Sequence, residues 1–411
     1  MDRNAISSPK WEELDGEYGD IFDDEELERT VSNSTLAVRC RTAELIGGEV
    51  ADAYHAFQSG DRRRFLEMMA GADGAKILML AFPELLPYGA WAEQLAENSV
   101  ICCCNNPIPA LFSGVPYCAY GIGGDYQTDC GRGDGFGVAM SLAFRRAYRI
   151  FAFNPHIAGH CRRLGFSNAV FLPYPIEDSV YCPGEGKYTA LWKEEVGGEV
   201  FALCTARIDF GVKGNGRTLI SELREVSRRV PNARFVFMRW GGDVERFEQE
   251  LSDAGIRDLC LLLTPVGKRR LIDYYRSADL LIDQLVYGYY GSTALEAGCI
   301  GLPVVLKFRE CQYRVFYGEE PPPFIGIEPG EDLVSEVARL LNDEKSRREE
   351  GNELRDWIER RHGERASTQI MEAFFRLAVE GVTIPFEDEN PLREALTDEE
   401  RSYHQEKAGD Q

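Results

Sequence analysis

The chain has 411 residues, of which 44% are hydrophobic and 11% aromatic, enough apolar side chain for two cores of ordinary size. Lysine and arginine total 46 against 68 aspartate and glutamate, a formal charge of −22. This excess of acid repels nucleic-acid phosphates and anionic membranes, so we expect no nucleic-acid partner and at most a peripheral membrane contact. No apolar run approaches the roughly 20 residues that span a bilayer. The acidic N-terminus also has no apolar signal core, so the sequence predicts a cytoplasmic protein.

The twelve cysteines are spread over a long chain, often in strand-like runs such as SVICCCNN at 99–106, and no Cys-x-x-Cys pair occurs. This distribution is typical of reduced, buried thiols rather than of a disulfide scaffold. His156 and His160 are one helical turn apart, but no flanking acid completes the zinc-protease pattern, and a pair on a helix surface is the alternative that we favour. The sequence therefore predicts neither disulfides nor a metal site.

The first half of the chain alternates short strand-like runs with longer helical ones. Such alternation is typical of βαβ units around a parallel sheet. We expect strands at 35–40, 75–82, 99–104, 116–120, 149–153 and 168–173.

The same pattern begins afresh after a polar, glycine-containing stretch at 182–199. We expect the second series of strands at 200–206, 233–240, 258–263, 279–283 and 302–307. The two series predict two tandem Rossmann-like, doubly wound α/β domains facing a central cleft. Ligands of such folds bind at the carboxyl ends of the strands.

The predicted organisation runs from an acidic arm to an acidic tail. We expect an arm with the composition of a disordered segment at 1–32, a first Rossmann-like domain at 33–180, a linker at 181–199, a second Rossmann-like domain at 200–362, a C-terminal helix packing back toward the first domain at 363–384, and an acidic tail at 385–411.

The stretch Tyr287–Val305 carries a glycine turn between a predicted strand and a short helix. Backbone N–H groups of Gly291, Ser292 and Thr293 would point out of the helix N-terminus, which is an anion site. Glu296, a turn later, can accept hydrogen bonds from ribose hydroxyls. An alternative stays open, because Thr293 and Glu296 have the Thr-x-x-Glu spacing of a capping box.

Arg207 and Lys213 lie just beyond the first strand of the second series, in CTARIDFGVKGNG. Fixed cations at the carboxyl end of a strand can hold a diphosphate and neutralise the charge that grows on it as a leaving group. The alternative is two ordinary surface cations on a loop.

The run YCAYGIGGD ends a strand of the first series with Gly123 and Gly124, which let a ligand approach the backbone. Asp125 follows and can orient a sugar hydroxyl; a plain glycine turn is the alternative. Beyond it, GRGDGFG at 131–137 mimics a dinucleotide fingerprint. It lies well after its strand, however, and no acid ends the next strand, so we expect no nicotinamide or flavin.

Taken in order, these stretches resemble the retaining glycosyltransferases of family 4 (glycosyl transferases group 1), over roughly residues 35–380. The run Asn168–Pro183 is similar to that family's hinge segment. The resemblance implies the GT-B fold, with an acceptor-side domain at 33–180 and a nucleotide-sugar donor domain at 200–362. It implies that Arg207 and Lys213 bind the donor pyrophosphate and that Glu296 binds the ribose.

The resemblance also covers Gly123, Gly124 and Asp125, which match the family's Gly-Gly-Asp loop. Two positions depart from the family pattern. The first glutamate of its paired-glutamate region is Gly288 here, and the histidine before the Gly-Gly-Asp loop is Ile122. These departures affect the sugar side of the donor and leave the phosphate and ribose ligands in place.

The activity that the resemblance implies is hexosyl transfer (EC 2.4) from a nucleotide-diphosphate sugar to a glycan, lipid or small-molecule acceptor. Transfer proceeds with retention, the departing phosphate takes the acceptor's proton, and no cofactor or metal is needed. Two alternatives remain: a non-catalytic nucleotide-sugar-binding protein of the same fold, and a sugar-nucleotide epimerase.

Overall fold

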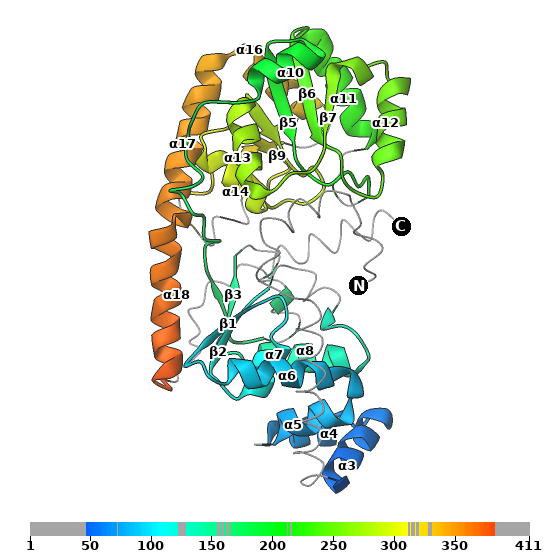
Figure 1. Ribbon diagram of the computed structural model, residues 1–411, viewed down its shortest axis with the longest axis vertical. Helices are drawn as coiled ribbons and strands as arrows, with labels where there is room; N and C mark the ends of the chain where they lie inside the picture. Colours follow the sequence, from blue (N-terminus) through cyan, green and yellow to red (C-terminus); the bar gives the residue numbers. More distant parts are fainter. Residues whose placement is uncertain are drawn as a thin grey trace. The chain divides into compact units, whose positions relative to one another are not determined.

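The computed structural model describes residues 47–382 except 72, 122–128, 154–156, 158–159, 162–163, 165, 212, 214–215, 311–312, 314–316, 318–319 and 328–330. The described residues divide into two compact units, drawn in Figure 1. The first unit contains residues up to Ala152, those within His156–Phe171, and the end of the last helix from Glu372. The second contains Phe153 and Leu172–Met371. The expected strand at 35–40 and both acidic termini lie outside the described residues.

The first unit is built on a parallel sheet with the strand order β1-β2-β3-β4. All residues of β3 are buried, as expected for an interior strand covered on both faces. Four of the strands predicted for this half of the chain are confirmed. They are β1 (Ile101–Cys104), β2 (Tyr117–Tyr120), β3 (Arg149–Ala152) and β4 (Ala169–Phe171).

The predicted strand at 75–82 is wrong, because these residues form a helix, α5 (Gly74–Ala81). An apolar run of this length fits a buried helix as well as a buried strand. Ile77, Leu78 and Met79 are all buried, since α5 packs among several other helices of the unit. Those helices are α3 (Gly47–Gln58), α4 (Arg62–Ala70), α6 (Leu86–Leu95), α7 (Ile108–Ser113) and α8 (Gly135–Arg146), with a short 3-10 turn, η2 (Pro83–Leu85).

The second unit contains a parallel sheet with the order β10-β9-β8-β5-β6-β7. This is the doubly wound order of a Rossmann fold, and its direction reverses between β5 and β8. The five predicted strands are confirmed, and β10 was not predicted. The strands are β5 (Val200–Cys204), β6 (Ala233–Met238), β7 (Cys260–Leu263), β8 (Leu280–Ile282), β9 (Val304–Leu306) and β10 (Ile325–Gly326).

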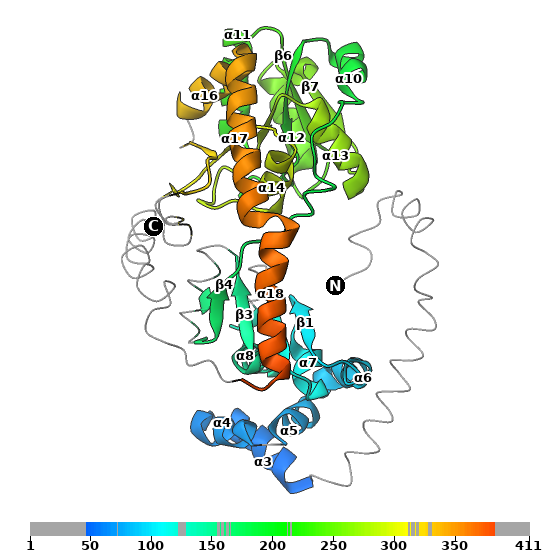
Figure 2. The same ribbon diagram turned by 90° about the vertical axis from the view of Figure 1, so that its left-hand side faces the viewer.

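The helices of the second unit bury their apolar stripes against the sheet and one another. Leu223 of α11 and Val337 of α16 join Phe235 of β6 in one core cluster. α14 packs against α17 (Figure 2), so closely that a Cβ on Gly298 would lie 2.6 Å from Ile358 Cδ1. The helices are α10 (Thr189–Val196), α11 (Arg217–Arg229), α12 (Val244–Asp253), α13 (Lys268–Ser277), α14 (Ser292–Cys299), α16 (Glu331–Asn342), α17 (Glu344–His362) and α18 (Glu364–Val379), with a 3-10 turn, η4 (Arg257–Leu259).

Residues 181–199 belong to the second unit. Helix α10 lies within the predicted linker, and its Trp192 is 1% exposed, with its ring 5.6 Å from that of Phe201. The boundary between the units falls inside α18, whose Phe374 lies 5.8 Å from Phe151 of β3.

The described residues show no helix that is both long and apolar enough to cross a membrane. The ten cysteines that the structure describes are all free thiols. In the same residues, no group of three His, Cys, Asp or Glu side chains could hold a metal ion.

Candidate functional site

The candidate site lies in the second unit, at the point where the strand order of the sheet reverses. β5 and β8 are neighbours in the sheet although β6 and β7 come between them in the sequence. The loops that follow β5 and β8 therefore emerge side by side at the carboxyl edge, which is where ligands of doubly wound folds bind. The first loop carries Arg207 and Lys213, and the second leads to Gly291, Ser292 and Thr293.

The loop after β5 is held by the residues that follow β6. The N–H of Ile208 donates to the carbonyl of Trp240 at 2.8 Å, and the N–H of Phe210 donates to Asp243 Oδ2 at 2.9 Å. Gly241 has φ +125°, and a Cβ there would lie 2.2 Å from the Ile208 carbonyl oxygen. The close approach of these two backbones therefore requires a glycine.

Arg207 lies in this fixed loop, with 43% of its side chain exposed and its guanidinium 3.3 Å from Asp209 Oδ2. Lys213 is turned toward the second loop. Its ammonium lies 3.4 Å from Gln284 Oε1 and 5.8 Å from the ring centre of Tyr287. Two cations on one fixed loop at the strand ends are suited to binding a diphosphate.

Gln284 connects Lys213 with the glycine turn. It is 4% exposed, and besides its contact with Lys213 its amide donates to the carbonyl of Tyr289. The backbone N–H of Leu285 also donates to the carbonyl of Lys213 at 3.2 Å. The two loops are thus joined by a buried amide that uses its acceptor on one and its donor on the other.

The N-terminus of α14 is open to a ligand. Gly291 is the N-cap and makes no side-chain capping bond, and Gly291, Ser292 and Thr293 are all half-buried. The first N–H groups of a helix have no partner within the helix, so they are donors for an anion placed there.

Glu296 does not close a capping box, because the N-cap is Gly291 rather than Thr293. It is 4% exposed, and Lys268 Nζ contacts both of its oxygens, at 2.6 and 2.7 Å. The hydroxyl of Tyr275 donates to Glu296 Oε2 at 3.3 Å. A carboxylate can accept about four hydrogen bonds. These two donors make three hydrogen bonds, which leaves Glu296 room for a hydroxyl of a ligand.

Asp283 is a buried carboxyl group that the sequence analysis missed. It directly follows β8 and is 8% exposed. Burial raises the pKa of its carboxyl from 3.8 to about 6; Lys213 lowers that pKa, and Glu296 raises it. The signal in the sequence was an acid and an amide, Asp283 and Gln284, directly after an apolar run that ends at the sheet edge. Lys268 and Tyr275 were also missed, because they come from α13.

Gly288, where the family resemblance calls for a glutamate, packs against Arg309. The N–H of Arg309 donates to the Gly288 carbonyl at 3.0 Å. A Cβ on residue 288 would lie 2.7 Å from both Cγ and Cδ of Arg309. Any side chain at 288 would therefore have to displace that of Arg309.

A buried aromatic network lies behind the glycine turn. The hydroxyl of Tyr290 is 2.9 Å from that of Tyr317, and the two hydroxyls lie 3.2 and 2.8 Å from His362 Nε2. His362 Nδ1 is 2.8 Å from the carbonyl of Tyr174, which can only accept, so Nδ1 carries the proton and Nε2 accepts. Burial lowers the pKa of His362 to about 4, against the effect of the Tyr174 hydrogen bond, so the imidazole is neutral near pH 7.

In the first unit, the predicted site residues Gly123, Gly124 and Asp125 lie outside the described residues, as does Ile122. The glycine run at 131–137 that mimics a dinucleotide fingerprint starts α8 instead. Asp134 caps this helix by accepting from the N–H of Gly137 at 3.0 Å, and a Cβ on Gly135 would lie 2.3 Å from the ring of Phe82. These glycines therefore allow close packing.

The second unit matches a family model. Residues 200–357 match the family described as Glycosyl transferases group 1, and the match includes Arg207, Lys213 and Glu296. No curated protein matches the sequence.

Solved structures of glycosyltransferases are similar to this chain. Sucrose-phosphate synthase from Thermosynechococcus elongatus is 16% identical, with a TM-score of 0.57 over 74% of this chain and 79% of that one. HepE from Anabaena, in complex with UDP and glucose, is 15% identical, with a TM-score of 0.59 over 81% and 96%. A glycosyltransferase from Rickettsia africae is 12% identical, with a TM-score of 0.52 over 72% and 82%.

At these identities the similarity shows the fold: two parallel-sheet α/β units of the GT-B type, as predicted. The family match in the second unit and this fold together support a glycosyltransferase (EC 2.4). The prediction of enzyme class is confirmed to that extent.

Proposed function

We propose that the chain transfers a sugar from a nucleotide-diphosphate sugar to an acceptor hydroxyl, with retention at the anomeric carbon and without a metal ion. The observation that carries the proposal is the convergence of four features where the strand order reverses. Arg207 and Lys213 lie on the loop after β5, and the uncapped N-terminus of α14 and the buried carboxylate of Glu296 follow β8.

In this proposal the donor diphosphate lies between the two cations and the N-terminus of α14. Arg207 and Lys213 supply positive charge, and the N–H groups of Ser292 and Thr293 supply hydrogen bonds. Glu296 accepts from the ribose hydroxyls through its remaining acceptor capacity. UDP is the first nucleotide to test, because HepE, a structural neighbour, was solved with UDP bound.

The chemistry follows from the charge distribution. The bond between the anomeric carbon and the diphosphate oxygen breaks, and negative charge grows on the departing phosphate. Arg207 and Lys213 stabilise that charge in the transition state more than in the ground state, which accelerates the step. The acceptor oxygen bonds to the anomeric carbon on the face that the phosphate leaves, and its proton passes to a phosphate oxygen.

The test is a transfer and hydrolysis assay on the full chain with a chelator present. UDP-glucose and other nucleotide sugars are incubated with panels of glycans, lipids and small alcohols, and release of the nucleoside diphosphate is measured. Proton NMR of the product gives the anomeric configuration. An α-linked product from an α-linked donor supports the proposal, and an inverted product or activity lost to the chelator contradicts it.

A second candidate is a nucleotide-sugar-binding protein without catalysis, and the observation that favours it is Gly288. The side chain of Arg309 occupies the space next to Gly288, so no carboxylate faces the donor sugar from that position. Nucleotide binding without turnover on any acceptor panel identifies this protein. Conversion of the donor to its epimer without an acceptor identifies an epimerase instead.

A further inference from the structure

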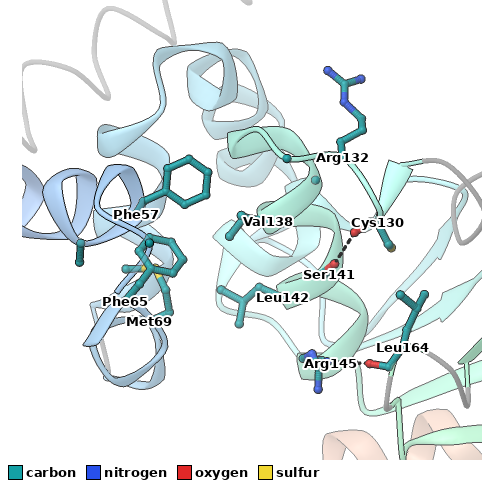
Figure 3. A pocket seen from close by; sticks show the side chains of 14 residues that line it. Phe57, Phe65, Met69, Cys130, Arg132, Val138, Ser141, Leu142, Arg145 and Leu164 are labelled. Carbon is teal, nitrogen blue, oxygen red and sulfur yellow. Dashed lines mark hydrogen bonds between the residues drawn. The ribbon is translucent and has the colours of Figure 1, made fainter. Parts of the chain in front are cut away.

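A cavity of about 760 Å³ lies in the first unit, between the helix pair α3–α4 and helix α8 (Figure 3). Its two charged lining residues, Arg132 and Arg145, stand at opposite ends of α8. Both are already bonded, Arg132 to the carboxylate of Asp134 and Arg145 to the carbonyl of Leu164. The cavity therefore offers a ligand an apolar surface without a charged group to select its chemistry.

An exposed tryptophan of the second unit, Trp240, lies at the carboxyl edge of the sheet, two residues after the end of β6. It is 45% exposed, whereas Trp192 and Trp357 of the same unit are 1% and 3% exposed. The indole N–H of Trp240 donates to the carbonyl of Thr205 at 3.1 Å, which fixes one edge of the ring. An aromatic ring that is held by one edge and partly open is preorganised to stack on a flat ligand.

Trp240 belongs to the turn that holds the loop of Arg207. Its carbonyl accepts from the N–H of Ile208 at 2.8 Å. A Cβ on the next residue, Gly241, would lie 2.8 Å from Cγ of Arg207. The indole is thus fixed beside one of the two cations that hold the diphosphate in the proposed function.

Thr205 connects Trp240 with the proposed ribose ligand. Its carbonyl accepts from the Trp240 indole, and its side chain lies beside the hydroxyl of Tyr275. That hydroxyl donates to Glu296 Oε2 at 3.3 Å. A nucleotide whose ribose reaches Glu296 and whose diphosphate reaches Arg207 therefore has its base within reach of the Trp240 ring.

We propose that Trp240 stacks on the base of the nucleotide donor. This inference rests on the proposed function. Every nucleobase has a π-face, and a base stacked on an aromatic side chain gains roughly 5- to 150-fold in affinity. Stacking on Trp240 thus makes the site select a nucleotide over a bare diphosphate, whichever base the chain binds best.

Titration calorimetry on the full chain tests this role, with UDP, ADP, GDP and inorganic pyrophosphate as probes. Trp240→Ala should weaken the tightest-binding nucleotide by about tenfold or more and leave pyrophosphate unchanged. Trp240→Phe keeps an aromatic ring but loses the indole N–H, so it should retain most of the nucleotide affinity. Trp91→Ala is the matched control, because Trp91 is 49% exposed in the first unit, and it should change neither affinity.

Fluorescence gives a second readout that a merely structural role would not move. The nucleotide should quench indole fluorescence in the parent chain, and this quenching should be lost in Trp240→Phe. Equal quenching in both chains would overturn the proposal.

Two calorimetric results would also overturn the stacking role. The first is unchanged nucleotide affinity in Trp240→Ala, and the second is an equal loss for nucleotide and pyrophosphate, which is the result of a displaced Arg207 loop. Either result, with nucleotide binding intact in the parent chain, contradicts the stacking role alone. A parent chain that binds none of the three nucleotides contradicts the proposed function and the stacking role together.

Discussion

Lys268 and Glu296 form an ion pair in which one ammonium contacts both carboxylate oxygens, at 2.6 and 2.7 Å. The two partners differ in exposure, since 60% of the lysine side chain is exposed and 6% of the glutamate side chain. The Lys268 ammonium thus reaches the buried carboxylate from the solvent side. A ribose hydroxyl would approach the carboxylate from the same side. The pair links α13 to α14 and holds Glu296 ready for a ligand.

Removing the lysine should therefore lower the stability of the folded chain. Lys268→Ala leaves a buried carboxylate with the Tyr275 hydroxyl as its remaining protein donor, so we expect a loss of about 1 kcal/mol in unfolding free energy, discounted for the exposure of the lysine. Urea denaturation measures this loss, and Arg269→Ala, an exposed neighbour on α13, is the control. A Lys268→Ala chain as stable as the control would show that the pair contributes nothing.

Glu296→Gln tests the ribose role directly. The amide keeps the shape of the side chain but replaces two anionic acceptors by one neutral acceptor, so UDP affinity should fall about tenfold, the value of one hydrogen bond to a charged group. Calorimetric titration with UDP and with inorganic pyrophosphate separates the contribution of the ribose to affinity from that of the phosphates. Equal loss for both ligands would place Glu296 outside the ribose site.

Gln284 should act on nucleotide binding through Lys213. Gln284→Leu removes the buried contact with Lys213 Nζ and the donor to the Tyr289 carbonyl, so Lys213 loses its fixed position. We expect a several-fold weaker affinity for UDP, smaller than the tenfold to hundredfold loss of Lys213→Ala, which removes the charge itself. Lys345→Ala, on the exposed face of α17, is the control for lysine removal. A Gln284→Leu chain with unchanged affinity would mean that Lys213 does not need the amide.

The buried hydroxyl network should be structural. Tyr317→Phe removes a hydroxyl that lies 2.9 Å from that of Tyr290 and 2.8 Å from His362 Nε2, which leaves buried polar atoms with fewer partners. The expected cost is about 1 to 3 kcal/mol, seen as a lower thermal midpoint. Tyr54→Phe is the matched control, because Tyr54 is 46% exposed. Equal midpoints for the two variants would contradict the network.

The ionisation of Asp283 should make the free energy of unfolding depend on pH. Burial raises the pKa of its carboxyl from 3.8 to about 6, so the folded state resists its ionisation. Stability from this group is complete below pH 3.8 and is lost as pH rises through about 6. Asp283→Asn cannot ionise, so its advantage over the parent chain should grow from near zero at pH 4 to roughly 3 kcal/mol at pH 7. His362 titrates equally in both chains and cancels in the difference.

Denaturant titrations of both chains between pH 4 and 8 measure this difference. In a Lys213→Ala background the difference should continue to rise to a higher pH and become larger, because Lys213 lowers the pKa of Asp283 in the folded chain. A difference between Asp283→Asn and the parent that does not change with pH would contradict the assignment.

Much of the fold follows from patterns within short stretches of sequence. All five strands predicted for the second unit are apolar runs of strand length between amphipathic helices, and that periodicity is local. The strand predicted at 75–82 is wrong, because a buried helix is apolar on every side and so has the same composition as a buried strand. β10, with Ile325 and Gly326, is too short to carry a pattern.

The sequence points to residues of the candidate site on the loops that follow strands, and to Glu296 in the helix that begins at the end of the second loop. Arg207 and Lys213 follow β5, and Ser292 follows the turn after β8, so topology alone brings them together. The partners of these residues depend on packing across the sequence. Lys268 reaches Glu296 from another helix, and Gln284 meets Lys213 across the neighbouring loops; no local pattern encodes either contact.

The most direct test of the central claim is the thermal unfolding midpoint of the chain with a panel of nucleoside diphosphates and nucleotide sugars, with chelator present. The parent chain is compared with an Arg207→Ala, Lys213→Ala double variant, since a ligand that binds only the folded state raises the midpoint with the logarithm of its saturation. We predict a shift for the nucleotides of one base that is absent in the double variant. No shift with any nucleotide, or an equal shift in both chains, would contradict the site at the reversal of the strand order.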